Sequence, residues 1–264
     1  MPRALFRSVN LIGDGLYIQP ALAAWMKEHL DWEVDLLTLD DHATCIYEGM
    51  GLPFRVVFDK QGEYDFEFAF DVNKAFSLGD REKIHIADAY AKLLGVKIEN
   101  RLPYYKPPDG QTEPGLILLS MFSRSCASRE GKPPNKMIGW VHWMQIIALL
   151  NQYGPIAVLG APDDRAALPL SEDQYYTGLP LEQIARLMRD AKLLVTIDNG
   201  LAHLAATQGT PMIEFYPACL GKHWIIPPTL PGKLFLVHMD PNQLSVTEAV
   251  LAVREGLKIV WRNK

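Results

Sequence analysis

Short apolar runs and longer stretches with apolar residues three and four positions apart alternate along this chain. The first pattern predicts buried strands, and the second predicts helices packed against a sheet. In the first hundred residues the predicted strands are 4–10, 33–39, 54–58 and 66–70, and the predicted helices are 16–30, 43–49 and 84–94. Residues 11–15, which include two glycines, are predicted to form a tight turn between the first strand and the first helix.

The segment 103–115 holds several prolines and glycines, as expected of a linker between domains. We therefore divide the chain into an N-terminal domain, residues 1–108, and a C-terminal domain, residues 109–264. In the second domain the predicted strands are 116–121, 155–159, 193–197, 211–215 and 233–237, and the predicted helices are 141–151, 181–190, 201–208 and 246–257. This order predicts an α/β fold with two Rossmann-like, doubly wound parallel sheets that face a ligand-binding cleft.

The composition disfavours several classes of protein. With 264 residues, 48% of them hydrophobic, the chain is large enough for two small domains with their own cores. Its apolar runs are far shorter than the roughly 20 residues of a membrane-spanning helix, and its start lacks the features of a signal peptide. The net charge of −5 disfavours nucleic acid as a partner. We therefore expect a cytoplasmic protein with at most peripheral membrane contact.

Neither the cysteines nor the histidines form a metal-binding pattern. Cys45, Cys126 and Cys219 are widely spaced and lack a C-x-x-C pair. The seven histidines are scattered, without an H-x-x-x-H or H-E-x-x-H arrangement. No G-x-G-x-x-G sequence follows a predicted strand, which disfavours a nicotinamide-dependent dehydrogenase. We therefore expect neither a metal nor another cofactor.

The clearest candidate for a binding site is the sequence TIDNGLAH, residues 196–203, between a predicted buried strand and a helix rich in small residues. Gly200 lets the backbone approach a ligand closely, and amides of Asn199 and Gly200 at a helix N-terminus suit a diphosphate. Asp198 precedes them and His203 lies in the first turn of the helix. The structural alternative is that Asp198 only caps the helix and His203 is a buried core residue.

This octapeptide is similar to the D-[ST]-G-x-x-H segment of glycosyltransferase family 9, the heptosyltransferases. The resemblance implies a GT-B fold, and it assigns Asp198, Gly200 and His203 to the binding of the diphosphate of a nucleotide-sugar donor. Asn199 stands where a serine or threonine is usual. We expect its side-chain amide, in place of the usual hydroxyl, to form a hydrogen bond with the nucleotide sugar.

A second similarity lies in NLIGDG, residues 10–15, followed by Pro20 and Leu22, which resembles the family's G-D-x-x-x-x-x-P-x-L loop. The resemblance makes Asp14 the general base that takes the proton of the acceptor hydroxyl. The structural alternative is an aspartate that caps the helix. Gly15 replaces the usual valine or isoleucine, which predicts a looser turn.

A third similarity covers residues 120–143 and resembles the family's phosphate-binding loop. It assigns Ser123 and Arg124 to the donor phosphates and Lys136 to the leaving diphosphate, whose charge grows in the transition state. The loop is longer than expected, and Arg129 or Lys132 is an alternative to Lys136.

A fourth similarity, to the family's G-x-P-x-E, assigns Asp164 to the donor ribose, and Leu179 is expected near the base. We also expect His223 and Trp224 to border the donor sugar. The acceptor is expected to contact loops around residues 40–42, 71–73 and 101–105.

The resemblance implies an inverting, metal-independent transfer of a heptose-like sugar from a nucleoside diphosphate, with ADP favoured, to a hydroxyl of a glycan or glycolipid. A nucleoside-diphosphate-sugar epimerase is the nearest enzymatic alternative. Two further hypotheses are a catalytically inactive glycosyltransferase-like binding module, and a transferase that acts on a protein or a modified nucleic-acid base.

Overall fold

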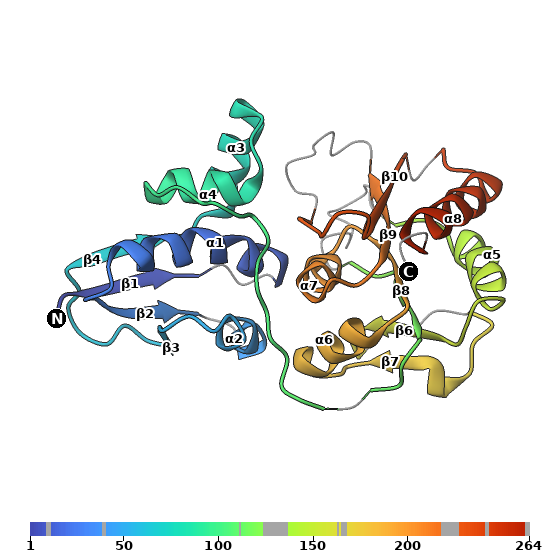
Figure 1. Cartoon of the computed structure of the whole chain (residues 1–264), viewed down its shortest axis with the longest axis horizontal. Helices are drawn as coiled ribbons and strands as arrows, with labels where there is room; N and C mark the ends of the chain where they lie inside the picture. Colours follow the sequence, from blue (N-terminus) through green and yellow to red (C-terminus); the bar gives the residue numbers. More distant parts are fainter. Residues whose placement is uncertain are drawn as a thin grey trace, which may run out of the picture. The chain divides into compact units, whose positions relative to one another are not determined.

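The computed structural model of the chain describes residues 1–8, 12–38, 41–110, 112–123, 137–162, 164, 168–217, 227–240 and 243–261, without the side chains of residues 41–43. The chain divides into two compact units (Figure 1). Met1–Lys106 forms the bulk of the first unit, and Pro107–Gly221 with Thr229–Lys264 forms the second. The division falls inside the segment that the sequence marks as a linker, while the acceptor and donor roles expected for the two units stay predictions.

The first unit contains a four-stranded parallel sheet in the order β3-β2-β1-β4. Strands β1 and β4 are neighbours although they are far apart in the sequence, and Phe6 lies opposite Phe68. The elements of this unit are β1 (Arg3–Arg7), α1 (Ile12–Glu28), β2 (Glu33–Leu37), α2 (Asp41–Glu48), β3 (Arg55–Val57), β4 (Phe66–Ala69), α3 (Val72–Glu82) and α4 (Ile86–Leu94).

One face of this sheet packs against helices through aromatic side chains. Phe6 of β1 meets Trp25 of α1 edge to face, with ring centroids 5.0 Å apart, and Trp25 stacks on Phe66 of β4. Helix α2 touches α1 through Tyr47, which lies against Gly15, and α4 packs along α1. Because Phe6, Trp25 and Tyr47 are almost fully buried, this face holds the hydrophobic core of the unit.

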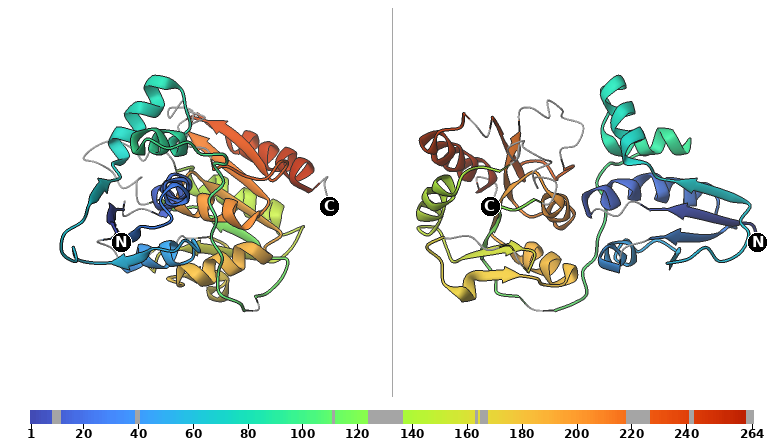
Figure 2. Two further views of the ribbon diagram at one scale, coloured as in Figure 1. Left: turned by 60° about the vertical axis from the view of Figure 1, so that its left-hand side comes forward. Right: turned by 180° about the vertical axis from the view of Figure 1, so that it is seen from behind.

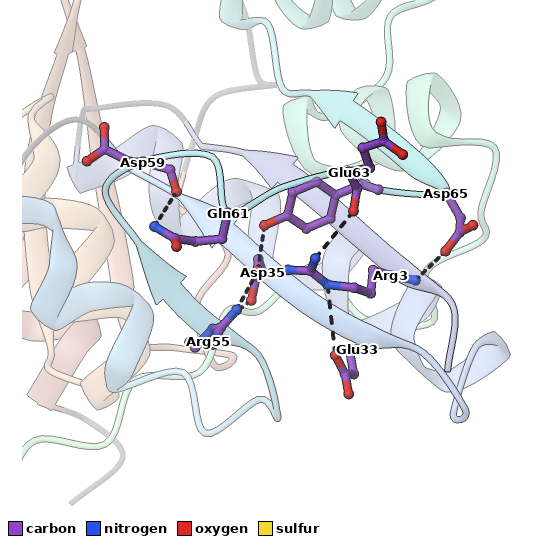
Figure 3. A network of polar contacts seen from close by, with 9 residues as sticks. Arg3, Glu33, Asp35, Arg55, Asp59, Gln61, Glu63 and Asp65 are labelled. Atoms are coloured by element: carbon purple, nitrogen blue, oxygen red, sulfur yellow. Dashed lines mark hydrogen bonds and ion pairs between the residues drawn. The ribbon is translucent and has the colours of Figure 1, made fainter.

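The opposite face carries a network of charged side chains (Figure 3). The connection from β3 to β4, residues 58–65, contains no helix. Its Tyr64 donates a hydrogen bond of 2.6 Å to Asp35 of β2, and Arg55 donates two more of 2.9 Å each. Arg3 lies over the Tyr64 ring, 4.4 Å from its centroid. Since Asp35 is buried, these donors replace the water that its carboxylate loses on folding.

The second unit contains a six-stranded parallel sheet in the order β10-β9-β8-β5-β6-β7. Its central strands are apolar and buried at nearly every position, as expected for a parallel sheet with helices on both faces. The elements are β5 (Ile117–Ser120), α5 (Trp140–Leu150), β6 (Ile156–Gly160), the short 3-10 helix η2 (Glu172–Gln174), β7 (Tyr175–Thr177), α6 (Leu181–Asp190), β8 (Leu193–Ile197), α7 (Gly200–Gln208), β9 (Met212–Pro217), β10 (Leu234–Met239) and α8 (Val246–Trp261).

Helices cover both faces of this second sheet (Figure 2). Helices α5 and α8 pack on the face that includes Leu119, Val195 and Phe215, where Trp143 of α5 is fully buried. Helices α6 and α7 lie on the other side, as both Figure 1 and Figure 2 show. The predicted α/β fold class with parallel sheets is therefore confirmed.

Some local features differ from the sequence prediction. Helix α1 begins at Ile12, so the expected turn at residues 11–15 was wrong and Asp14 lies in the first helical turn. Helix α3 was not predicted because only Ala75, Leu78 and Gly79 of its residues are buried, which leaves a weak apolar pattern. Strand β7 was not predicted either, since it has only three residues.

Candidate active site

The described donor-site candidates follow four neighbouring strands of the second sheet. Ser123 follows β5, Asp164 follows β6, Leu179 follows β7, and the segment 198–203 follows β8. These strands are parallel and lie in the order β8-β5-β6-β7. Parallel strands end at the same edge of a sheet, so residues up to 80 positions apart in sequence gather at one edge.

The strand order reverses direction between β5 and β8. From β5 the chain proceeds to β6 and β7 on one side, and it then returns to β8, β9 and β10 on the other side. Open α/β sheets bind ligands in the crevice outside such a switch point, because the loops there diverge to opposite faces. Ser123 and Asp198 follow the two strands that flank this point.

Asn199 joins the two strands across the switch point. Its Nδ2 atom donates hydrogen bonds to Ser120 Oγ at 2.8 Å and to the Phe122 carbonyl at 3.0 Å. Its Oδ1 atom accepts from the backbone amides of Leu201 at 3.0 Å and Ala202 at 3.1 Å, which caps helix α7. The expected donation from this amide to a diphosphate therefore differs from what is observed, because protein groups already take both of its protons.

Helix α7 brings the remaining residues of the segment into the interior. Gly200 is its first residue, and the N-cap at Asn199 is extended. Asp198 is 3% exposed and His203 is 7% exposed. Small buried side chains on α7, namely Ala202, Ala205 and Ala206, allow the helix to approach the sheet closely. Both polar residues are therefore buried where α7 begins, at the edge of the sheet.

The turns after β6 and β7 pack against each other. Asp164 accepts a hydrogen bond of 2.7 Å from the Ala161 amide, which uses one carboxylate oxygen to hold the turn. A Cβ atom at Gly160 would lie 2.7 Å from the Asp164 side chain, so only glycine fits there. Gly178, which has a positive φ, lies against Pro162 and places Leu179, partly buried, at the start of α6. The structure therefore places Asp164 and Leu179 on two turns that contact each other.

An aromatic pair that the sequence analysis missed lies beside Ser123. The rings of Phe122 and Trp140 have centroids 5.9 Å apart, and Trp140 is 40% exposed. The two residues follow β5 and begin α5, so only the fold could show that they meet. The predicted phosphate-binding residues Arg124 and Lys136, with their alternatives Arg129 and Lys132, lie outside the described residues, as do His223 and Trp224.

In the first unit, Asp14 follows β1 and Asp71 follows β4, and these two strands flank the switch point of the first sheet. Asp71 caps α3 by accepting hydrogen bonds from the amides of Asn73 and Lys74. Asp14 is partly buried in the first turn of α1, where a carboxylate interacts favourably with the helix dipole. The expected base therefore lies at the carboxyl edge of its sheet.

Two buried tyrosines, Tyr47 and Tyr90, lie near the start of α1. A Cβ atom at Gly15 would lie 3.0 Å from the Tyr47 hydroxyl, so this glycine makes room for the Tyr47 ring, and the expectation of a looser turn was wrong. Burial raises the pKa of the Tyr90 hydroxyl, and the charges of Asp14 and Asp71 raise it further. The Tyr90 hydroxyl makes no hydrogen bond within the described part of the chain. It therefore stays protonated as a donor beside the two carboxylates.

Gln19 fixes the helix that carries Asp14. Its Oε1 atom accepts a hydrogen bond from the Tyr104 amide, and its Nε2 atom donates to the Tyr104 carbonyl at 2.7 Å. Gln19 is 4% exposed, and it ties α1 to a segment that the sequence analysis expected near the acceptor. A glutamine within an otherwise apolar stretch of the predicted helix, residues 16–26, was the available sign of this role.

The described residues contain no group of three or more His, Cys, Asp or Glu side chains placed to hold a metal ion. Nor does any helix in that part of the chain have the length and apolar character needed to cross a membrane.

Residues 125–225 match the family Glycosyltransferase family 9 (heptosyltransferase). Lipopolysaccharide heptosyltransferase 1 of Escherichia coli K12 is 39% identical over 127 residues, which cover 44% of this chain. The match spans 37% of the length of that relative. These findings confirm the predicted resemblance to glycosyltransferase family 9, and the matched stretch includes the segment 198–203.

Two solved structures resemble the chain along nearly its whole length. The glycosyl transferase family 9 protein from Veillonella parvula gives a TM-score of 0.73 at 14% identity, covering 97% of each chain. The ADP-heptose lipopolysaccharide heptosyltransferase II of Escherichia coli gives 0.66 at 14% identity, covering 97% of this chain and 98% of that one. At this identity the likeness shows the fold, and the predicted GT-B fold is confirmed.

Proposed function

We propose that this protein is a glycosyltransferase that moves a sugar from a nucleoside diphosphate to the hydroxyl group of a glycan or glycolipid. ADP-heptose is the favoured donor, since heptosyltransferases are among the proteins that the chain resembles in sequence and fold. The observation that carries the proposal is the gathering of Ser123, Asp164, Leu179 and the segment 198–203 at one switch point, within or next to the family-matched stretch.

In the proposed reaction, Asp14 takes the proton from the acceptor hydroxyl. The acceptor oxygen attacks the anomeric carbon of the donor sugar, and the bond from that carbon to the diphosphate breaks, so the configuration inverts. Negative charge then grows on the leaving diphosphate. Arg124 and Lys136 are proposed to balance this charge in place of a metal ion, together with the hydroxyl of Ser123.

The two carboxylates have separate proposed roles. Asp14 acts on the acceptor, and Asp164 holds the donor ribose with the carboxylate oxygen that does not bind the Ala161 amide. Leu179, partly buried on the neighbouring turn, is proposed to contact the base. The acceptor is proposed to bind in the cytoplasm, with at most peripheral contact between the protein and a membrane.

The proposal is tested first by calorimetric titration with ADP, UDP and GDP. We expect ADP to bind with a micromolar Kd, and we expect an Asp198→Ala, His203→Ala variant of unchanged thermal stability to lose this binding. Absence of binding to all three nucleotides would overturn the donor assignment. Binding without any sugar transfer would instead support the inactive binding module.

The second test concerns Asp14. Replacing Asp14 by asparagine removes the base but keeps the size and polarity of the side chain, so kcat is expected to fall about 100-fold or more while the Kd for ADP is unchanged. The configuration of the product, followed by NMR, is expected to be inverted, and a metal chelator is expected to leave kcat unchanged. An Asp14→Asn variant with normal turnover would contradict the assignment.

A further inference from the structure

Asn199 uses its entire hydrogen-bonding capacity within the protein. An asparagine side chain offers two amide protons and a carbonyl oxygen with two lone pairs. All of these are used, on Ser120 Oγ, the Phe122 carbonyl and the amides of Leu201 and Ala202, at distances between 2.8 and 3.1 Å. We call this arrangement the Asn199 bridge.

The Asn199 bridge connects the two strands that flank the switch point. Ser120 ends β5 and lies opposite Thr196 of β8 in the sheet, and the Thr196 hydroxyl lies 3.1 Å from the Ser120 carbonyl. Beyond this pair the strands end, and the bridge continues the connection to Phe122 on one side and to α7 on the other. The bridge therefore fixes the distance between Phe122, which precedes Ser123, and the first turn of α7, which begins at Gly200.

The side chain at position 199 decides whether this connection exists. Serine or threonine, the residues usual in the family pattern, can cap α7 through the hydroxyl oxygen. Their single proton can satisfy at most one of the two acceptors on the β5 side. Ser120 is 1% exposed, so water cannot readily replace the lost partner of its hydroxyl.

We propose that Asn199 is a positioning residue of the donor site, which holds Ser123 and the start of α7 at a fixed separation and does not itself touch the diphosphate. This proposal rests on the proposed function, because it presumes that the donor binds at this switch point. It also explains the departure from the family pattern, because an amide can join both sides of the switch point at once and a hydroxyl cannot.

The test compares three substitutions by calorimetric titration with ADP. Asn199→Ser keeps the cap and loses the double donation to β5, so the Kd for ADP is expected to rise about tenfold. Asn199→Ala removes both sides of the bridge, and its Kd is expected to rise at least as much. Ser120→Ala removes one bond and leaves the cap intact, and a rise of a few-fold is expected, which provides a milder variant if Asn199→Ala fails to fold.

A matched control separates positioning from loss of stability. Ser245 caps α8 in the same unit, with its hydroxyl bonded to the Glu248 carboxylate at 2.6 Å and to the Glu248 amide at 3.2 Å. Ser245→Ala is expected to lower the Tm to a similar degree as Asn199→Ser while the Kd for ADP stays unchanged. In steady-state kinetics the Asn199 variants are expected to raise the donor KM more than they lower kcat.

The outcomes distinguish this proposal from the proposed function. If the wild-type protein binds ADP and Asn199→Ser binds it equally well or more tightly, the bridge does not position the site and the proposal is overturned. If Ser245→Ala weakens ADP binding as much as Asn199→Ser does, the effect is one of stability and the proposal is again overturned. If the wild-type protein binds no nucleotide, the proposed function itself fails.

Discussion

The two parallel sheets of this protein are built from similar strands but are covered differently. In the second unit, helices pack on both faces, and successive residues of β5 such as Leu118 and Leu119 are both fully buried. In the described part of the first unit, helices pack on the face of Phe6. The other face, on which Leu5 is also buried, has no covering helix and carries charged side chains such as Arg3 and Asp35 (Figure 3).

This difference follows from the connections between strands. The β3–β4 connection of the first unit has only eight residues, which is too short to include a covering helix of ordinary length. The face of the sheet without a helix therefore carries charged residues, and hydrogen bonds from Arg55 and Tyr64 to the buried Asp35 stabilise it. The comparison shows that both faces of a parallel sheet need packing partners. Where the connection between two strands is too short for a helix, polar side chains can be those partners.

The largest expected loss of stability comes from alanine substitutions at two neighbouring positions of one strand, whose side chains lie on opposite faces of the sheet. Leu118→Ala and Leu119→Ala are each expected to lower the free energy of unfolding by about 2–5 kcal/mol, because both leave a cavity. In β1, Phe6→Ala is expected to cost about 3–5 kcal/mol, whereas Arg7→Ala, whose side chain is 52% exposed, stays within about 0.5 kcal/mol of the wild type. Denaturant unfolding measures the loss, and hydrogen exchange shows in which unit it occurs.

Equal losses for Phe6→Ala and Arg7→Ala would show that the side chain of Arg7 contributes as much to stability as the buried ring of Phe6. A small loss for either leucine variant would show that one face of the second sheet is open.

A smaller loss of stability is expected when Gly15, in the helix that covers the first sheet, is replaced by a larger residue. Gly15→Val places methyl groups against the Tyr47 ring, since even a Cβ atom comes within 3.0 Å of its hydroxyl oxygen. The expected loss is about 1–3 kcal/mol in the free energy of unfolding. Adding Tyr47→Phe removes the nearest atom and is expected to recover part of that loss in the same denaturant experiment.

The control for this prediction is Ala23→Val, a partly buried position of the same helix, which carries the lower helix propensity of valine without the contact to Tyr47. Equal losses for Gly15→Val and Ala23→Val would mean that packing against Tyr47 does not require glycine.

The smallest loss of stability is expected for substitution of Asp35, on the charged face of the first sheet, and its size depends on pH. Burial alone raises the pKa of Asp35, but the hydrogen bonds from Arg55 and Tyr64 and the charges of Arg55 and Arg3 outweigh it, so its pKa lies below the usual value. A carboxyl whose pKa is lowered in the folded protein stabilises above its unfolded pKa of about 3.9, and this contribution disappears as the pH falls through the folded pKa.

Asp35→Asn is therefore expected to lower the free energy of unfolding by about 1 kcal/mol near neutral pH, with a difference from the wild type that narrows below about pH 4. Thermal unfolding at a series of pH values measures this difference. Glu67→Gln is the matched control: a hydrogen bond from Lys60 lowers the pKa of Glu67, but this carboxylate is solvent-exposed on the same sheet, and no measurable change in Tm is expected. A difference for Asp35→Asn that does not depend on pH would contradict the role of its charge.

The sequence by itself determined most elements and the order in which they occur. Helix α6 and strand β8 have the predicted bounds, because a strongly amphipathic helix and a continuous apolar run each have one stable arrangement against a sheet. The sequence also predicted the resemblance to glycosyltransferase family 9 from residues 196–203, since that motif is local and needs no contact with the rest of the chain.

Only the tertiary structure decided what these residues contact. Asn199 was interpreted as a donor to the ligand, but its partners Ser120 and Phe122 lie 79 and 77 positions away in sequence, on a strand that becomes its neighbour only through the order β8-β5. Gly15 was expected to loosen a turn, yet it accommodates the ring of Tyr47 on another helix. Propensity and spacing act over a few residues, whereas these contacts depend on which strands pair and which helices pack against them, and those choices are made by the chain as a whole.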